Sequence, residues 1–160
     1  MSHPSLGLPP PDLTAGRPAA GDAIRGSRAR LAARALQVAI DADPTIRTRY
    51  DDLGLRQLLH DAEVFLDQVA TAAAAGDIRD VTGWAETVVP LFRRRNVPMD
   101  DLVALAEGCR MAIAATLVPG EDDTAQAAID EAIRVFRWHR RLAGDARRRN
   151  RFLHAIYKGA

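Results

Sequence analysis

Residues 55–75 read LRQLLHDAEVFLDQVATAAAA, and this stretch is the strongest structural signal in the chain. Apolar side chains recur there at i, i+3, i+4 and i+7, the spacing that places them on one face of an α-helix. The opposite face is charged, and Gly76 directly after the alanines is typical of a helix end. The stretch therefore predicts an amphipathic helix whose apolar face consists of Leu55, Leu58, Leu59, Ala62, Phe65, Leu66 and Val69.

Helical periodicity continues on both sides of this stretch. The sequence predicts a first helix from near Asp22, a good N-cap residue, to just before Pro44, which disfavours helix at the preceding residue. A short helical turn is expected in residues 44–52. Further helices are expected to begin at Asp77, at Pro98 and among residues 121–124.

The fold class follows from this pattern. We find no alternating β pattern of useful length, no internal repeat and no βαβ rhythm. The predicted fold is all-α, an antiparallel helical bundle of five to six helices joined by short connections. Pro90 lies inside the helix that follows Asp77 and is expected to kink it or to open a turn.

The 160 residues divide into three predicted parts. Residues 1–21 are rich in proline and are expected to form a disordered arm. Residues 22–143 form the helical domain, and residues 144–160 a basic helical extension. Gly144 is expected to separate these two, because glycine is unfavourable inside a helix.

Charge is distributed unevenly, although the formal net charge is only +1. Residues 134–160 contain nine basic residues and one acidic residue, which gives +8 and leaves −7 for residues 1–133. This asymmetry predicts an acidic protein partner for the C-terminal segment, or self-association. The arginines expected to bind a partner are Arg137, Arg140, Arg141, Arg147, Arg148, Arg149 and Arg151.

Two alternatives to protein binding stay open for these arginines. They can simply form a solvated helical face. They can also bind nucleic acid, because arginine contacts phosphate through paired hydrogen bonds and Trp138 and Tyr157 could stack on bases. The acidic remainder of the chain would repel DNA, so protein contact is favoured over an adaptor role on nucleic acid.

Residue types that carry catalysis do not gather into a motif. Paired aspartates at 51–52, 100–101 and 122–123 fall at loops or helix starts, where capping and the helix dipole explain them. No histidine pair has the spacing of a helical metal site, and the single cysteine, Cys109, falls on a predicted buried face. We therefore expect no catalytic residue, no metal, no cofactor and no enzyme activity.

His139 is the histidine that borders an apolar helix face, and it is the candidate axial ligand if the protein binds haem. His60 lies opposite the apolar face of its helix and is expected to be solvated. A haem-binding or small-ligand sensor is therefore an alternative to a protein-interaction module.

Membrane insertion and secretion are not expected. No stretch approaches the roughly 20 apolar residues that a membrane-spanning helix needs. The first 21 residues have neither the basic start nor the apolar run of a signal peptide. One cysteine cannot form a disulfide within the chain, so a reducing, cytoplasmic setting is expected.

The segment LRQLLHDAEVFLDQVATAAAAGD, followed by WAETVVPLFRRRNVPMDDLVALAEGCRMAIAATL, resembles the N-terminal domain family of the RsbT co-antagonist proteins of the bacterial stressosome. The clearest element is NVPMDDLVALAEGCRMAI, and the resemblance covers roughly residues 25–140. It implies a globin-like helical fold without haem, a homodimer, and a regulatory or sensory role in bacterial signalling or stress response. The family supplies no catalytic residues to transfer.

The leading hypothesis is therefore a dimeric, non-catalytic regulatory module that works by contacting other proteins. We expect the dimer to bury surface from the first and last helices. The candidate contacts are Ile24, Leu31, Phe136 and Leu153.

Overall fold

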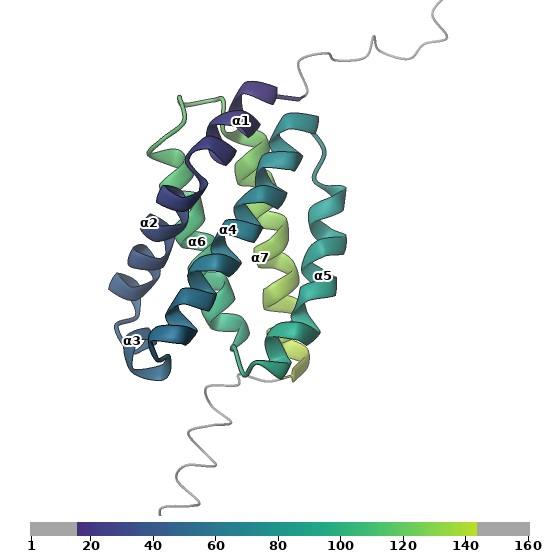
Figure 1. The fold of residues 1–160 in the computed structure, drawn as a ribbon. Coiled ribbons are helices and arrows are strands. Elements are labelled where there is room, and N and C mark those ends of the chain that lie inside the picture. The colour runs from purple at the N-terminus through teal and green to yellow at the C-terminus, as the bar shows by residue number, and fades with distance from the viewer. Residues whose placement is uncertain (1–15, 144–160) are drawn as a thin grey trace, which may run out of the picture.

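The computed structural model describes residues 16–143, and within that range it is all-helical with no strand (Figure 1). The prediction of an all-α fold is confirmed. The described residues contain seven helices where five to six were expected. They are α1 (Pro18–Gly26), α2 (Arg28–Ala42), α3 (Ile46–Arg49), α4 (Asp52–Ala75), α5 (Arg79–Arg94), α6 (Met99–Ala114) and α7 (Asp123–Ala143).

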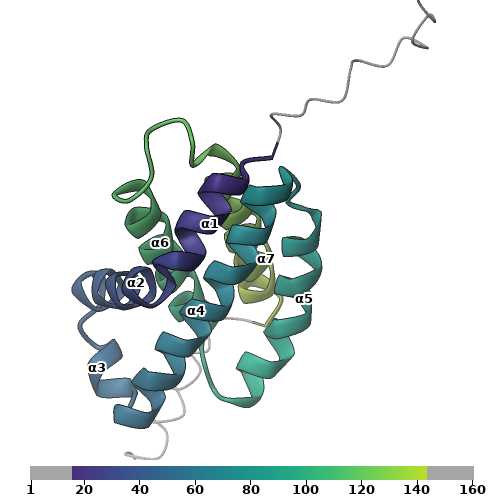
Figure 2. The ribbon, with the colours of Figure 1, turned by 45° about the horizontal axis from the view of Figure 1, so that its top comes forward.

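Helix α4 is the centre of the assembly. It has 24 residues and contacts α1, α2, α5, α6 and α7. Figures 1 and 2 show α4 with α1 and α2 on one side and α5 on the other. The apolar face predicted for this helix is largely buried, and Leu66 and Val69 are completely inaccessible to solvent. The segment with the clearest helical pattern in the sequence is thus also the central helix of the fold.

The N-terminal helix differs from its predicted form in two ways. It begins at Pro18 and not near Asp22, so residues 18–21, which were assigned to the arm, are helical. Ala20 and Gly21 are buried, because their small size lets α1 approach α4 closely. The helix also ends at Gly26, and α2 begins after Ser27, so the single predicted helix is two. Residues 1–15 and the extension at 144–160 lie outside the described residues.

The other helix boundaries agree closely with the sequence. The short turn expected in residues 44–52 is α3. Asp51 caps α4 by accepting a hydrogen bond from the Gly54 amide at 2.7 Å, and Gly76 ends the same helix at a φ of 67°. Pro90 does not open a turn, since α5 continues through it to Arg94. No helix in the described range has the length and apolarity to cross a lipid bilayer.

Asp101 has a role beyond the start of α6. Its carboxylate is buried, with 2% of the residue exposed, and it accepts hydrogen bonds from the Arg49 guanidinium and the Tyr50 hydroxyl, both at 2.7 Å. Burial by itself would lower the pKa of Arg49, but the hydrogen bonds and negative charges of Asp101 and Asp43 together outweigh burial and raise that pKa. The interaction ties α3 and the residue after it to the first turn of α6.

Helices α2 and α6 meet at Gly108. A Cβ atom at this position would lie 2.2 Å from the carbonyl oxygen of Ala35, well inside van der Waals contact. The surrounding side chains, Ala32, Cys109 and Ala112, are small and buried. Glycine is therefore required at Gly108 for the two backbones to approach this closely.

We predict opposite effects for two glycines inside helices. Gly108→Ala should lower the free energy of unfolding by about 1–3 kcal/mol or more, because α2 must move to admit the methyl group. Gly83→Ala should raise it by about 0.5–1 kcal/mol, because a Cβ there meets nothing within 4 Å and alanine favours helix. Urea unfolding of both variants tests this. Equal stability of the two proteins would contradict the close contact.

Candidate functional site

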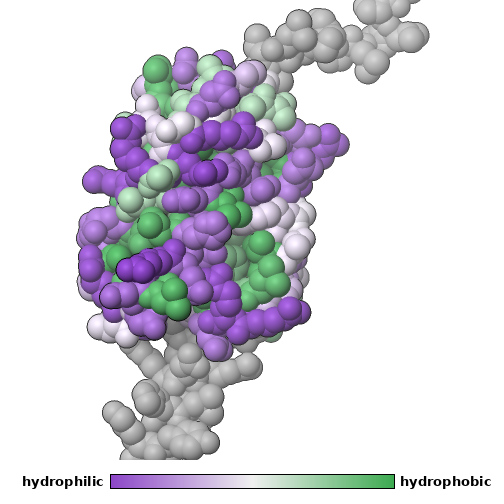
Figure 3. All heavy atoms as spheres, in the orientation of Figure 1, coloured by the Kyte–Doolittle hydropathy of each residue, from purple (hydrophilic) through white to green (hydrophobic). Residues whose placement is uncertain are grey.

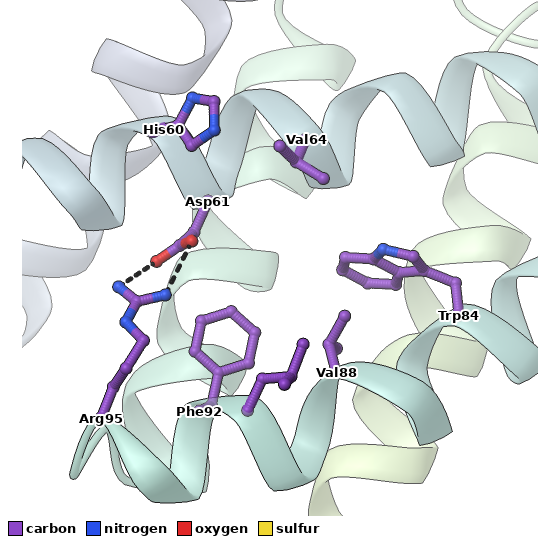
Figure 4. Close-up of a pocket in the computed structure, with 8 residues that line it drawn as sticks. His60, Asp61, Val64, Trp84, Val88, Phe92 and Arg95 are labelled. Atoms are coloured by element: carbon purple, nitrogen blue, oxygen red, sulfur yellow. Dashed lines mark hydrogen bonds and ion pairs between the residues drawn. The ribbon is translucent and has the colours of Figure 1, made fainter.

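An open groove of about 140 Å³ lies between α4 and α5 (Figure 4). Helix α4 and the stripe of α5 at i, i+4, i+7 and i+8 supply its two walls. In Figure 3, hydrophobic side chains reach the surface on the face where α4 and α5 lie side by side. The lining residues are His60, Asp61, Val64, Trp84, Val88, Leu91, Phe92 and Arg95.

The middle of the groove is apolar. Phe92 is buried at its base, while Leu91 is 49% exposed at its edge. The indole of Trp84 stacks on the ring of Phe65 with centroids 5.4 Å apart and planes inclined by 20°. Stacking holds the Trp84 ring in one orientation, so this wall of the groove is preformed.

One end of the groove is closed by an ion pair. The Arg95 guanidinium donates two hydrogen bonds to the Asp61 carboxylate, at 3.0 and 2.8 Å, and its Cζ atom lies 5.2 Å from the centroid of the Phe92 ring. The bonds to Asp61 raise the pKa of Arg95 above its usual value. The arginine therefore joins α4 to the C-terminal end of α5 and covers part of the apolar base.

Helix α5 is held against α7 by polar contacts on its other side. The Thr82 hydroxyl donates a hydrogen bond to the Glu131 carboxylate at 2.7 Å. The Oε2 atom of Glu86 lies 2.6 Å from Nε2 of His139. Arg93 donates to the backbone carbonyl of His139 at 3.1 Å. Three contacts along the helix thus fix the position of the groove wall.

His139, the candidate haem ligand, does not line the groove. Its side chain is 18% exposed and its Nε2 contacts Glu86 of α5. The structure therefore places the ring in an interhelical polar contact, a role that sequence reasoning did not anticipate. His60 is exposed, as expected for its face of α4.

The described arginines of the predicted partner-binding set lie on α7. Arg140 pairs with Asp100 at 2.8 Å, and Arg137 lies 3.9 Å from Glu107, so both face acids of α6. Arg141 lies over the ring of Trp138, with its Cζ atom 5.4 Å from the centroid. The remaining four, Arg147, Arg148, Arg149 and Arg151, lie outside the described residues.

The dimer contacts named from sequence need correction. Ile24, Leu31 and Phe136 are 0%, 2% and 3% exposed, because their helix faces pack into the core of one chain. They offer no accessible surface to a second copy. Leu153 lies outside the described residues.

Cys109 is buried as predicted. Burial raises the pKa of its thiol to about 12, so the reactive thiolate is not populated near neutral pH. Within residues 16–143, no three side chains of histidine, cysteine, aspartate or glutamate group together as metal ligands would.

The groove, and the place of Trp84 and Leu91 in it, were not predicted from the sequence. The spacing of these residues could have indicated a shared surface, because positions 84, 88, 91 and 95 fall on one side of a helix. An amphipathic helix with a second, half-exposed stripe indicates a surface for another apolar group.

Comparison with known proteins adds no relative: scans of family models, curated proteins and solved structures each return no match.

We predict an acid-dependent loss of stability from Glu131. Hydrogen bonds from Arg134, and then from Thr82, lower the pKa of this carboxyl from 4.5 to about 2 in the folded protein. The stabilisation is present above pH 4.5 and is lost as the pH falls towards 2. Because Arg134 is mostly exposed, solvent screens the pair and the loss should be about 1 kcal/mol.

Urea unfolding between pH 7 and pH 3 measures this dependence. Glu131→Gln removes the titrating group and should flatten the acid slope relative to the unmodified protein. An identical slope in the two proteins would show that Glu131 is not held in this way.

Proposed function

We propose that the protein is a non-catalytic regulatory module that binds an amphipathic helical segment of another protein in the α4–α5 groove. The observation that carries this proposal is the preformed apolar groove, with half-exposed Leu91 at its edge and the Asp61–Arg95 pair at its end. Helix-in-groove binding needs such an apolar floor with polar groups at its border.

The size of the groove favours a protein partner over an enclosed small molecule. Sites for drug-sized ligands usually measure about 300–1,000 Å³ and enclose most of the ligand. The groove measures about 140 Å³ and is open to solvent, which suits one or two side chains of a partner helix. Tryptophan and arginine, here Trp84 and Arg95, are also the residue types enriched at the centres of protein interfaces.

The resemblance to the stressosome family supports the wider context of this proposal. It adds a globin-like arrangement of the bundle, a homodimeric state and a role in bacterial signalling or stress response. The basic segment at residues 144–160 supplies positive charge for association with an acidic partner.

Partner binding in the groove is tested by substituting one exposed leucine that lines the groove and one that does not. Leu91→Asp places a charge at the edge of the apolar floor and should weaken partner binding roughly tenfold or more. Leu53→Asp makes the same change on a leucine that is 63% exposed and does not line the groove, and should leave binding intact. Quantitative mass spectrometry compares host proteins retained by the unmodified protein and by each variant.

A host protein kept by Leu53→Asp and lost from Leu91→Asp supports the groove. If the two variants retain the same proteins in the same amounts, the groove is not the binding surface.

The dimer is tested by sedimentation equilibrium over a range of concentrations. We expect a mass of about twice the 17.4 kDa of one chain at micromolar concentration. A single species of 17.4 kDa at the highest concentration would overturn the homodimer.

A further inference from the structure

We propose that residues 151–158 dock as an amphipathic helix in the α4–α5 groove of the same chain, so that a partner must displace this segment to bind. The inference deepens the proposed function and rests on it, because it assigns the resting occupant of the same groove.

The sequence of residues 151–158, RFLHAIYK, has the pattern that the groove requires. In a helix, Phe152, Leu153, Ile156 and Tyr157 fall within one sector of about 140°, since each residue turns the helix by about 100°. The opposite side carries Arg151, His154 and Lys158. In that conformation the segment would have a compact apolar face and a separate polar one.

The end of α7 places this segment within reach of the groove. Arg93 of α5 donates to the His139 carbonyl at 3.1 Å, so the last turns of α7 lie beside the part of α5 that carries Leu91. Eight residues lie between Ala143 and Phe152, and the nine Cα–Cα steps from one to the other span up to about 30 Å. That length covers the groove wall from Arg95 to Trp84, which is about 16 Å along the helix axis.

The sizes of segment and groove also agree. An eight-residue helix is about 12 Å long, which is shorter than the wall formed by α5. The groove is open, so a helix can lie along it with its polar side towards solvent. One or two of the four apolar side chains can then fill the space beside Trp84 and Val88, and Leu91 covers the others from the edge.

Charge favours the same placement. Residues 144–160 carry five basic residues and one acid, which gives +4. Helix α4 carries −3 and α5 together with Arg95 carries +2, so the two walls of the groove together carry −1 with histidine neutral. The segment and the groove therefore attract, and the short tether raises the effective concentration of the segment at the groove.

Trp84 reports directly on occupation of the groove. Trp138→Phe in the full chain removes the second tryptophan, which is 48% exposed on α7, and leaves the fluorescence to Trp84. In this background, Leu153→Asp with Ile156→Asp should shift Trp84 emission to longer wavelength and raise its acrylamide quenching about twofold. His154→Asp adds a charge on the polar side of the segment and should change neither property.

Unchanged Trp84 emission and quenching in the Leu153→Asp, Ile156→Asp protein would overturn the proposal. So would an equal change in the His154→Asp protein. Far-ultraviolet circular dichroism and urea unfolding of each variant confirm that the helical core is folded.

Disulfide cross-linking separates docking within one chain from exchange between two copies. Leu91→Cys is combined with either Leu153→Cys or Ile156→Cys, and the buried Cys109 thiol stays unreactive. Oxidation should give a disulfide within one chain, seen as a monomer of altered mobility on a non-reducing gel. A dimer band would replace the proposal with docking on a second copy, and no cross-link in either protein would contradict it. Leu53→Cys with Leu153→Cys is the matched control and should not cross-link.

The same variants distinguish docking of the chain's own segment from binding of a host protein. If Trp84 does not respond to the segment but Leu91→Asp still loses a host partner, the groove binds other proteins without being occupied by its own chain. If Leu91→Asp loses no partner but the cross-link forms, the groove serves only the chain's own segment.

Discussion

At Gly108 the backbone of α6 lies against the carbonyl group of Ala35 in α2, with no room for a Cβ atom between them. A second close approach occurs where Gly21 of α1 faces the Ala70 carbonyl of α4. Because these small residues let the helices meet backbone to backbone, Leu66 and Val69 of α4 are fully enclosed. The position of α4, and with it one wall of the groove, therefore depends on glycine and alanine at the helix crossings.

The apolar face of α4 could be predicted because helix periodicity is a local property of the sequence. The ends at Gly76 and Pro98 were predictable for the same reason. The break at Ser27 was not, since Gly26 and Ser27 are tolerated inside helices and tertiary packing decides whether α1 and α2 are collinear. The bond between Asp101 and Tyr50 joins residues far apart in sequence, and no local pattern indicates such a pair.

The site was less predictable than the fold. His139 and the arginines of α7 were predicted to bind ligands or partners because of their residue types. In the structure, His139 contacts Glu86, Arg137 lies near Glu107, and Arg140 pairs with Asp100. Most of the residues that line the groove are ordinary apolar side chains. Trp84 and Leu91 become part of a groove only because α4 and α5 lie side by side, and that arrangement depends on packing across the whole bundle.

Pro90 lies in α5, between Thr82, which is bound to Glu131, and Leu91 at the edge of the groove. Proline has no amide hydrogen, so the carbonyl of Glu86 has no backbone donor at i+4. The backbone ladder of α5 is thus one hydrogen bond short between these two residues. The part of the wall that carries Leu91 therefore owes more of its position to side chains, namely Arg93 bound to the His139 carbonyl and Arg95 bound to Asp61.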